Sequence, residues 1–287
     1  MAVTLGTNIA SLQAQRRLGL ATEQLGSTFE KLSSGQRINK ASDDAAGLAI
    51  ADALRAKQRV AAVAIRNAND GISTIAIADS ALSEVGNVLS RLAELSEQSA
   101  NGVFSVNQRS ALANEFVALG SEIERIAVTT EFNGVKLLSA NTSVVLQVGF
   151  DSGSTSQISY TGVQGTLAAL GLATSGQSSL SYSINGATIS DGQSAARAAL
   201  DAVNLAIGSL ASTRGTLGAA EARLRVSINN LSVARENFAA AESRIRDVDV
   251  ASEAAELTRL NILQQAGASV LAQANQQPAL ALNLLGR

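Results

Sequence analysis

Apolar residues recur at alternating steps of three and four over most of the second half of the chain. This is the heptad spacing of a coiled-coil helix. No proline interrupts the stripe, and arginine or glutamate takes each of its polar positions. The pattern therefore favours one long helix over a set of shorter bundle helices. Its positions are Leu200, Val203, Ile207, Leu210, Arg214, Leu217, Glu221, Leu224, Ile228, Leu231, Arg235, Phe238, Glu242 and Ile245.

The first half of the chain carries an apolar stripe with the same alternating steps from Asp44 to about Ala100. The stripe is interrupted at Asp79 and Gly86. Asp43 and Asp44 fit a helix cap better than a catalytic carboxylate pair, because free backbone N–H groups at a helix start need acceptors. A third helix is expected after the Asn101–Gly102 turn. The stripe between Asp44 and Ala100 contains Ile65, Ala68, Ile72, Ile75, Leu82, Leu89 and Ala93. The apolar face of the third helix contains Leu112, Phe116, Leu119, Ile123 and Ile126.

Between about Thr129 and Ser194 the pattern changes to period two, with many Ser, Thr, Gly and Asn residues. Asn133–Gly134 predicts a tight turn. Residues 144–148 and 157–160 flank a polar turn as the strands of a hairpin would, and residues 181–189, centred on Asn185–Gly186, predict a second hairpin.

The two chain ends carry thinner stripes, in which small residues take about half of the positions. A fully buried leucine contributes roughly 1.5 to 3 kcal/mol, whereas fixing one residue's backbone costs about 1 to 2 kcal/mol. A single pair of such helices is therefore marginal, and we expect it to fray in the monomer and to become ordered in an assembly. The stripes are Ala14, Leu18, Ala21, Leu25, Thr28 and Leu32 at one end, and Leu260, Leu263, Gly267, Val270 and Ala274 at the other.

Composition narrows the class of protein. The chain has no cysteine and no histidine, which excludes disulfides, thiolate or imidazole metal sites and Ser-His or Cys-His catalysis. Only 3% of its residues are aromatic, which suits thin helix seams. A formal charge of -2 without a basic cluster argues against nucleic acid. The uncharged tail, residues 260–286, holds too many amides for a membrane span, and the first twenty residues lack a secretory signal pattern.

Taken together, these patterns predict a mainly α fold. Long antiparallel coiled-coil helices form a rod, the terminal arms pair with each other, and a small β-hairpin region lies at the far end.

The chain resembles bacterial flagellin, the subunit of the flagellar filament, over nearly its whole length. Each motif alone is weak, but their order and spacing are specific. The matching segments are residues 8–12 (NIASL), 32–39 (LSSGQRIN), 41–50 (ASDDAAGLAI), 99–102 (SANG), 132–134 (FNG), 262–267 (ILQQAG) and 274–276 (ANQ).

The resemblance implies that residues 1–43 pair with residues 250–287 as the filament's inner tube, while residues 44–143 and 195–249 form a helical rod. It implies a short variable region at 144–194, with little or no separate outer domain. Flagellins are exported through the flagellum without a cleaved signal peptide, which places the protein outside the cell. The implied partners are further copies, an export chaperone, and the filament cap and hook-associated proteins; no cofactor, nucleic acid or membrane is implied.

Many flagellins are bound by Toll-like receptor 5 through the rod, and the residues that match that site here are Arg91, Leu95 and Glu115. The alternative is that these three side chains serve only subunit packing. For the assembly seam, the stripes single out Leu18, Leu25, Leu32, Leu260, Leu263 and Val270.

Other classes of protein stay open at this point. A hook-filament junction protein would also have terminal helices that pair. A monomeric or dimeric coiled-coil adaptor would show the same heptads. An enzyme would have to work with carboxylates, lysine or tyrosine alone.

Overall fold

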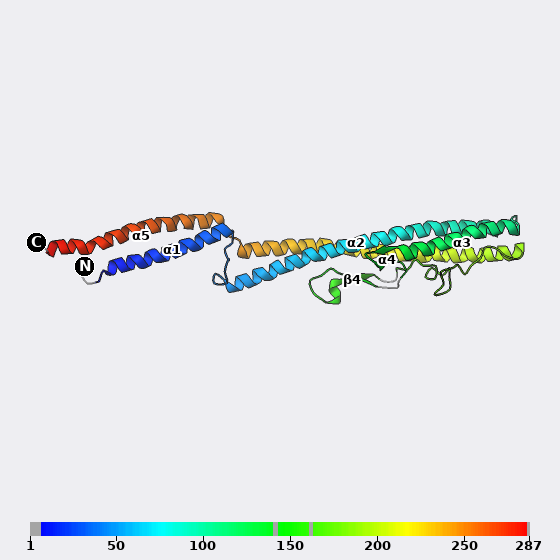
Figure 1. Cartoon of the computed structure of the whole chain (residues 1–287), viewed down its shortest axis with the longest axis horizontal. Coiled ribbons are helices and arrows are strands. Elements are labelled where there is room, and N and C mark those ends of the chain that lie inside the picture. The colour runs from blue at the N-terminus through cyan, green and yellow to red at the C-terminus, as the bar shows by residue number, and fades with distance from the viewer. Residues whose placement is uncertain (1–6, 140–142, 161–162, 286–287) are drawn as a thin grey trace. The chain divides into compact units, whose positions relative to one another are not determined.

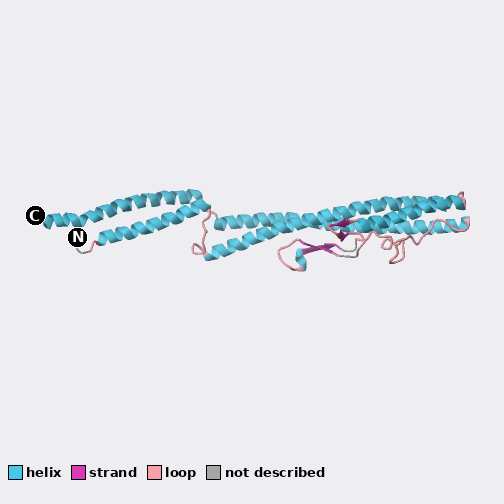
Figure 2. Ribbon diagram, viewed as in Figure 1, coloured by secondary structure: helices cyan, strands magenta, loops and turns pink. Residues whose placement is uncertain are grey.

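The computed structural model describes residues 7–139, 143–160 and 163–285, with side chains described as far as Gln276. These residues form five α-helices and two small antiparallel strand pairs, so the mainly α fold class is confirmed (Figures 1 and 2). The helices are α1 (Ile9–Ser34), α2 (Ala45–Ala100), α3 (Val106–Thr129), α4 (Ile189–Arg246) and α5 (Val250–Leu285).

The chain divides into two compact units. Unit 1 comprises Met1–Gln58 and Glu236–Arg287, and unit 2 comprises Arg59–Arg235. The ends of the predicted arms, residues 1–6 and 286–287, lie outside the described residues. The finer division into arms, rod and variable region stays a proposal.

The core of unit 2 lies between α2, α3 and α4. The long stripe predicted on α4 is confirmed as one helix, although it begins at Ile189, earlier than the predicted start at residue 195. Helices α2 and α4 run antiparallel, since Asp79 bonds Arg214 while the carbonyl of Ala100 accepts from Gln193. The stripe residues buried on α4 are Val203, Leu210, Leu217, Leu224 and Leu231.

Helix α3 begins with a capping box. The Ser105 hydroxyl accepts from the backbone of Gln108, and the Gln108 side chain accepts from the backbone of Ser105. This arrangement satisfies backbone N–H groups that have no partner inside the helix. Phe116 and Ile123 of α3 are buried against the core of unit 2, as the predicted stripe requires.

Caps also set the limits of the first two helices. The Asp44 carboxylate accepts from the backbone N–H of Gly47 at 2.9 Å, at the start of α2, which is the predicted capping role. Asp43 instead accepts from the backbone of Asn39 and Lys40 in the preceding turn. Helix α1 ends at Gly35, whose φ of 71° is left-handed and favours glycine.

The strands lie along one side of unit 2. Strands β1 (Glu131–Phe132) and β2 (Val135–Lys136) are joined by Asn133 and Gly134, which have φ of 50° and 78°, as a type I′ turn requires. Strands β3 (Val144–Gln147) and β4 (Gln157–Tyr160) form the first predicted hairpin.

The β3–β4 hairpin lies beside the N-terminal part of α2 in unit 2. The Asn67 amide donates to the carbonyl of Gln147 at 3.0 Å, and the side chain of Leu146 occupies the space above Gly71. The prediction placed the strands at the far end of the rod. Within unit 2 they pack instead along its side, where Gly71 leaves room for Leu146.

The second predicted hairpin, residues 181–189, is wrong. Residues 181–188 form no strand, and Ile189 opens α4. A type I′ turn needs positive φ at both central residues, and neither Asn185 nor Gly186 has it. Ile184 is fully buried, and its carbonyl accepts from the Ser99 hydroxyl at 2.6 Å. The segment is therefore bonded to α2 rather than to a second strand.

Candidate functional site

The candidate sites in this chain are surfaces rather than catalytic clusters. Within the described residues, no group of three or more His, Cys, Asp or Glu side chains could hold a metal ion. In the same part of the chain, no helix combines the length and the apolar character that crossing a membrane demands. The features that remain are the terminal helix pair and the solvent-facing sides of unit 2.

In unit 1, helices α1 and α5 lie side by side and antiparallel (Figure 1). At the chain ends, the Asn8 amide donates to the carbonyl of Ala274 at 2.8 Å, and the Ser11 hydroxyl donates to the Asn275 side chain at 2.7 Å. One tail amide, Asn275, and the Asn8 amide at the other chain end thus bond across the pair.

The seam between α1 and α5 is narrow. Ala14 and Thr28 are buried on α1, and Leu260 and Ala274 are buried on α5. A methyl group placed on Gly267 would lie 3.4 Å from Cδ1 of Leu18, so the two helices approach closely there. The predicted seam residues Leu18, Leu25 and Leu32 are only half-buried.

Two predicted seam residues lie outside this contact. Leu263 is 46% exposed and Val270 is 59% exposed. The inward residues of α5 are Leu260, Gln264, Gly267, Leu271 and Ala274, which follow steps of four, three, four and three. The prediction used the opposite order of steps. Because α5 has apolar residues on both faces, its hydrophobic pattern does not fix the phase, and the polar Gln264 takes a seam position.

Apolar side chains therefore remain uncovered on the outer faces of both terminal helices. These side chains are available for contacts with another protein surface. The exposed residues are Ile9, Leu12, Leu20 and Phe29 on α1, and Ile262, Leu263 and Val270 on α5.

The segment that follows α1 is bonded to the end of α4 within unit 1. The backbone N–H of Arg37 donates to the carbonyl of Arg246 at 2.6 Å, and the N–H of Val248 donates to the carbonyl of Gly35 at 3.1 Å. The Arg246 guanidinium donates to the Gln36 side chain at 3.0 Å. These bonds form a clasp between residues 35–37 and 246–248. It was not predicted from the sequence, because backbone groups make most of its bonds and leave no pattern there.

On unit 2, Arg91 lies in an exposed ion-pair network. Its guanidinium contacts Glu94 at 2.8 Å and Glu115 at 2.9 Å, and these two carboxylates raise the pKa of the Arg91 side chain. Leu95, the third residue that matches the receptor site predicted from the sequence, has no exposed surface. Residues four apart on a helix differ by about 40° in direction, which turns Leu95 from the exposed edge into the core.

Arg109 is a buried residue that the sequence analysis missed. Its side chain has no exposed surface, and it donates to the carbonyls of Ile189 and, at 2.9 Å, Asn101. It thereby ties the start of α3 to the end of α2 and to the start of α4. The sequence feature that could have revealed this residue is its position three residues before Leu112, on the apolar face of α3.

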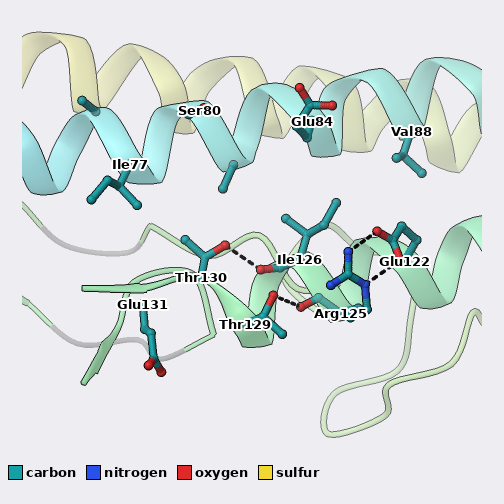
Figure 3. Close-up of a pocket in the computed structure, with 12 residues that line it drawn as sticks. Ile77, Ser80, Glu84, Val88, Glu122, Arg125, Ile126, Thr129, Thr130 and Glu131 are labelled. Carbon is teal, nitrogen blue, oxygen red and sulfur yellow. Dashed lines mark hydrogen bonds and ion pairs between the residues drawn. The ribbon is translucent and has the colours of Figure 1, made fainter. Parts of the chain in front are cut away.

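A groove of about 750 Å³ lies between α2 and α3. Figure 3 shows Ile77 and Ile126 facing the space between the two helices. At its edge, Glu122 bonds Arg125, which lowers the pKa of the Glu122 carboxyl group and keeps it ionised. An apolar floor with an ion-paired edge suits a contact with another protein surface.

Comparison with known proteins finds a family match for each end of the chain. Residues 5–143 match the bacterial flagellin N-terminal helical region, and residues 200–285 match the bacterial flagellin C-terminal helical region. These matches include the helices that pair in unit 1 and most of the helices of unit 2. The family is one of structural filament proteins rather than enzymes.

Similar full-length proteins agree with this match. A flagellin of Halalkalibacterium halodurans is 44% identical over 279 residues, covering 97% of this chain and 98% of that protein. The flagellar filament 33 kDa core protein of Treponema phagedenis is 39% identical, with the same coverage. Flagellin B of Vibrio anguillarum is 33% identical over 376 positions, covering all of both chains. The chain therefore belongs to the bacterial flagellin family.

Proposed function

We propose that this chain is a structural subunit that polymerises into the filament of a bacterial flagellum. The observation that carries the proposal is the α1–α5 pair. The two segments that match the flagellin terminal regions form one narrow seam and leave apolar side chains uncovered on their outer faces. Neighbouring copies would cover those faces, and repetition of that contact builds a filament.

The narrow seam also supports ordering on assembly. A pair of helices that buries few large side chains gains little free energy against the cost of ordering its backbone. In the filament, neighbouring pairs would add contacts at Leu263, Val270 and Phe29, which are exposed in the single chain. The seam residues would then be rigid only in the polymer.

The finer parts of the proposal follow family membership. The subunit leaves the cell through the flagellar export apparatus without a cleaved signal peptide. An export chaperone covers α5 before export, and the filament cap and hook-associated proteins meet the polymer at its ends. The apolar outer face of α5 is suited to such a chaperone, because an uncovered stripe invites aggregation before assembly.

A short variable region is supported by alignment length. The alignment with Vibrio anguillarum flagellin B spans 376 positions, whereas this chain has 287 residues. The relative thus carries inserted residues, which supports a short variable region at 144–194 with little or no separate outer domain.

Toll-like receptor 5 would recognise the exposed network of Arg91 and Glu115, without Leu95, which lies in the core. The test is receptor signalling by monomeric protein. Arg91→Ala should signal more weakly than the parent chain, while Arg125→Ala, which removes another exposed ion-paired arginine, should signal equally. Equal signalling by Arg91→Ala would remove this residue from the proposal.

Seeded growth tests the filament function directly. Purified monomer is mixed with short filament fragments and followed by electron microscopy. A filament subunit lengthens the fragments in proportion to monomer concentration. A coiled-coil adaptor, the main alternative, would stop at a small closed oligomer and leave the fragments unchanged.

A further inference from the structure

The sequence holds three Asn–Gly pairs, at residues 101–102, 133–134 and 185–186. In such a pair the backbone nitrogen of the glycine is able to attack Cγ of the asparagine, because glycine has no side chain that hinders the approach. The attack is fast only where the fold holds the two groups together. The three pairs differ in this respect.

In the third pair the asparagine side chain is folded over the next peptide group. The backbone N–H of Gly186 donates to Oδ1 of Asn185 at 3.0 Å. Because Cγ is bonded directly to Oδ1, the attacking nitrogen lies beside the carbon that it would attack. The hydrogen bond also polarises the side-chain carbonyl, which makes its carbon a better electrophile.

The Ser183 hydroxyl bonds the backbone of Asn185 on both sides. It accepts from the Asn185 N–H at 3.2 Å and donates to the Asn185 carbonyl at 3.2 Å. When the Gly186 nitrogen loses its proton, negative charge spreads onto that carbonyl oxygen, since the two atoms belong to one conjugated peptide group. A donor that faces the oxygen where charge develops stabilises the reactive anion.

Packing holds the pair in place. Ile184 is fully buried, and its carbonyl accepts from Ser99 of α2. On the other side, a Cβ on Gly186 would lie 2.5 Å from the backbone nitrogen of Gly192 in the first turn of α4, so glycine alone fits there. Asn185 is only half-buried, which leaves it open to water and to a base from solvent.

The other two pairs each lack part of this arrangement. The Asn101 carbonyl also accepts a hydrogen bond, from Arg109, but Oδ1 of Asn101 accepts from the N–H of Val103 at 3.2 Å and not from the next residue. Asn133 lies in the tight turn between β1 and β2, where strand pairing on both sides holds its φ at 50°. Within the described residues, its side chain makes no bond to the N–H of Gly134.

We propose that Asn185–Gly186 is a self-modifying site, at which the folded chain converts Asn185 into aspartate and isoaspartate. A base from solvent takes the proton from the Gly186 nitrogen, and this nitrogen forms a bond to Cγ. The bond from Cγ to Nδ2 breaks, and Nδ2 leaves as ammonia with protons supplied by water. Water then opens the cyclic imide at Cγ to give aspartate, or at the main-chain carbonyl carbon to give isoaspartate.

The products change both charge and geometry at the start of α4. Either product adds a carboxylate to a segment that is bonded to α2, and isoaspartate also adds a methylene group to the main chain. The close contact of Gly186 with Gly192 leaves no room for that extra length, so the modified segment has to shift.

Incubation of the purified, folded chain in a mildly alkaline buffer tests the site. Mass spectrometry of its peptides measures conversion at each Asn–Gly pair, because replacement of the amide by a carboxyl group raises the peptide mass. A methyltransferase specific for isoaspartyl residues identifies isoaspartate. We expect Asn185 to convert about tenfold or more faster than Asn101 and Asn133, since only its side chain is held on the attacking nitrogen.

The unfolded chain is the matched control. In guanidinium chloride the fold no longer distinguishes the three pairs, and each asparagine has the same residue after it. Asn101, Asn133 and Asn185 should then convert at similar rates.

Ser183→Ala tests the stabilising donor. It should slow conversion at Asn185 about threefold or more, which corresponds to the loss of one modest hydrogen bond. A segment that the substitution merely loosened would convert at an equal or higher rate. Ser190→Ala, on the exposed first turn of α4, should leave the rate at Asn185 unchanged, and circular dichroism verifies that both variants are folded.

Two results would overturn the proposal. One is conversion of Asn185 in the folded chain that is no faster than conversion of Asn101 or Asn133. The other is a Ser183→Ala chain in which Asn185 converts as fast as in the parent chain. Neither measurement depends on filament growth, so the proposed filament function is tested separately.

Discussion

Arg109 illustrates how one residue can organise the end of a helical unit. Its guanidinium replaces water as the hydrogen-bond donor to the carbonyls of Asn101 and Ile189, which end α2 and begin α4. No carboxylate balances the charge in these bonds, so the residue acts by bonding backbone acceptors where helices meet.

Arg109→Met keeps much of the aliphatic volume but removes both donors. We expect a loss of about 1 to 3 kcal/mol in the free energy of unfolding, because the Asn101 carbonyl is left without its donor and the Ile189 carbonyl keeps only its bond within α4. Urea unfolding followed by circular dichroism measures it. Arg125→Met, at an exposed position, should change the unfolding free energy by less than about 0.5 kcal/mol. A loss no larger than that of the control would contradict the role of Arg109.

The Asp79–Arg214 pair between α2 and α4 predicts an acid dependence of stability. The hydrogen bonds from Arg214 lower the pKa of the Asp79 carboxyl group below its ordinary value of 3.8. The unfolded chain therefore takes up the proton first on acidification. The pair's contribution is complete above the ordinary pKa and disappears as pH falls through the lowered one.

Both side chains of this pair are about 40% exposed, so solvent screening limits the effect to about 0.5 kcal/mol. Asp79→Asn should reduce stability by that amount at pH 6, and the difference from the parent chain should be smaller at pH 2, since acidification approaches the lowered pKa of the carboxyl group. Unfolding by urea at both pH values measures it. A difference that is undiminished at pH 2 would show that the carboxylate charge is not responsible.

Sequence pattern locates residues on helices better than it assigns their faces. The stripes on α2, α3 and α4 lie in the core because apolar residues fill one face and charged residues the other. On α5 both faces are apolar, so the pattern did not show that Leu263 and Val270 lie outside the α1–α5 contact. The same limit applies to Leu95 at the edge of a face. It lies about 40° around α2 from the exposed Arg91, and this rotation places it in the core.

At the scale of elements, the helices and the first hairpin followed from local signals. Heptads, the Asp44 cap, the Ser105 capping box and Gly35 act within a few residues of the positions that they determine. The segment at 181–188 did not follow, because its conformation depends on bonds to α2 that are distant in sequence. The clasp between residues 35–37 and 246–248 is non-local in the same way.

Gly267 is a point of close approach in the α1–α5 seam and allows a direct test of the pair. Gly267→Leu places a large side chain against Leu18 and should separate the helices, although leucine favours helix more than glycine does. Ala268→Leu, on the exposed side, makes a similar change in size without touching α1. We expect Gly267→Leu to stop seeded growth and Ala268→Leu to preserve it; the reverse would place the seam on the other face.

At the scale of the whole molecule, one unit is well packed and the other is marginal. Unit 2 buries large side chains from three helices, whereas the α1–α5 pair of unit 1 buries mainly small ones. For the proposed filament subunit, ends that become ordered only on assembly fit growth by the addition of copies. The polymer, rather than the single chain, would supply the missing contacts.

Amide hydrogen exchange in monomer and in seeded filaments tests this central claim most directly. We predict fast exchange across residues 9–34 and 250–276 in the monomer, slow exchange in unit 2 in both states, and strong protection of the two terminal segments in the filament. Strong protection of these segments in the monomer would contradict the account.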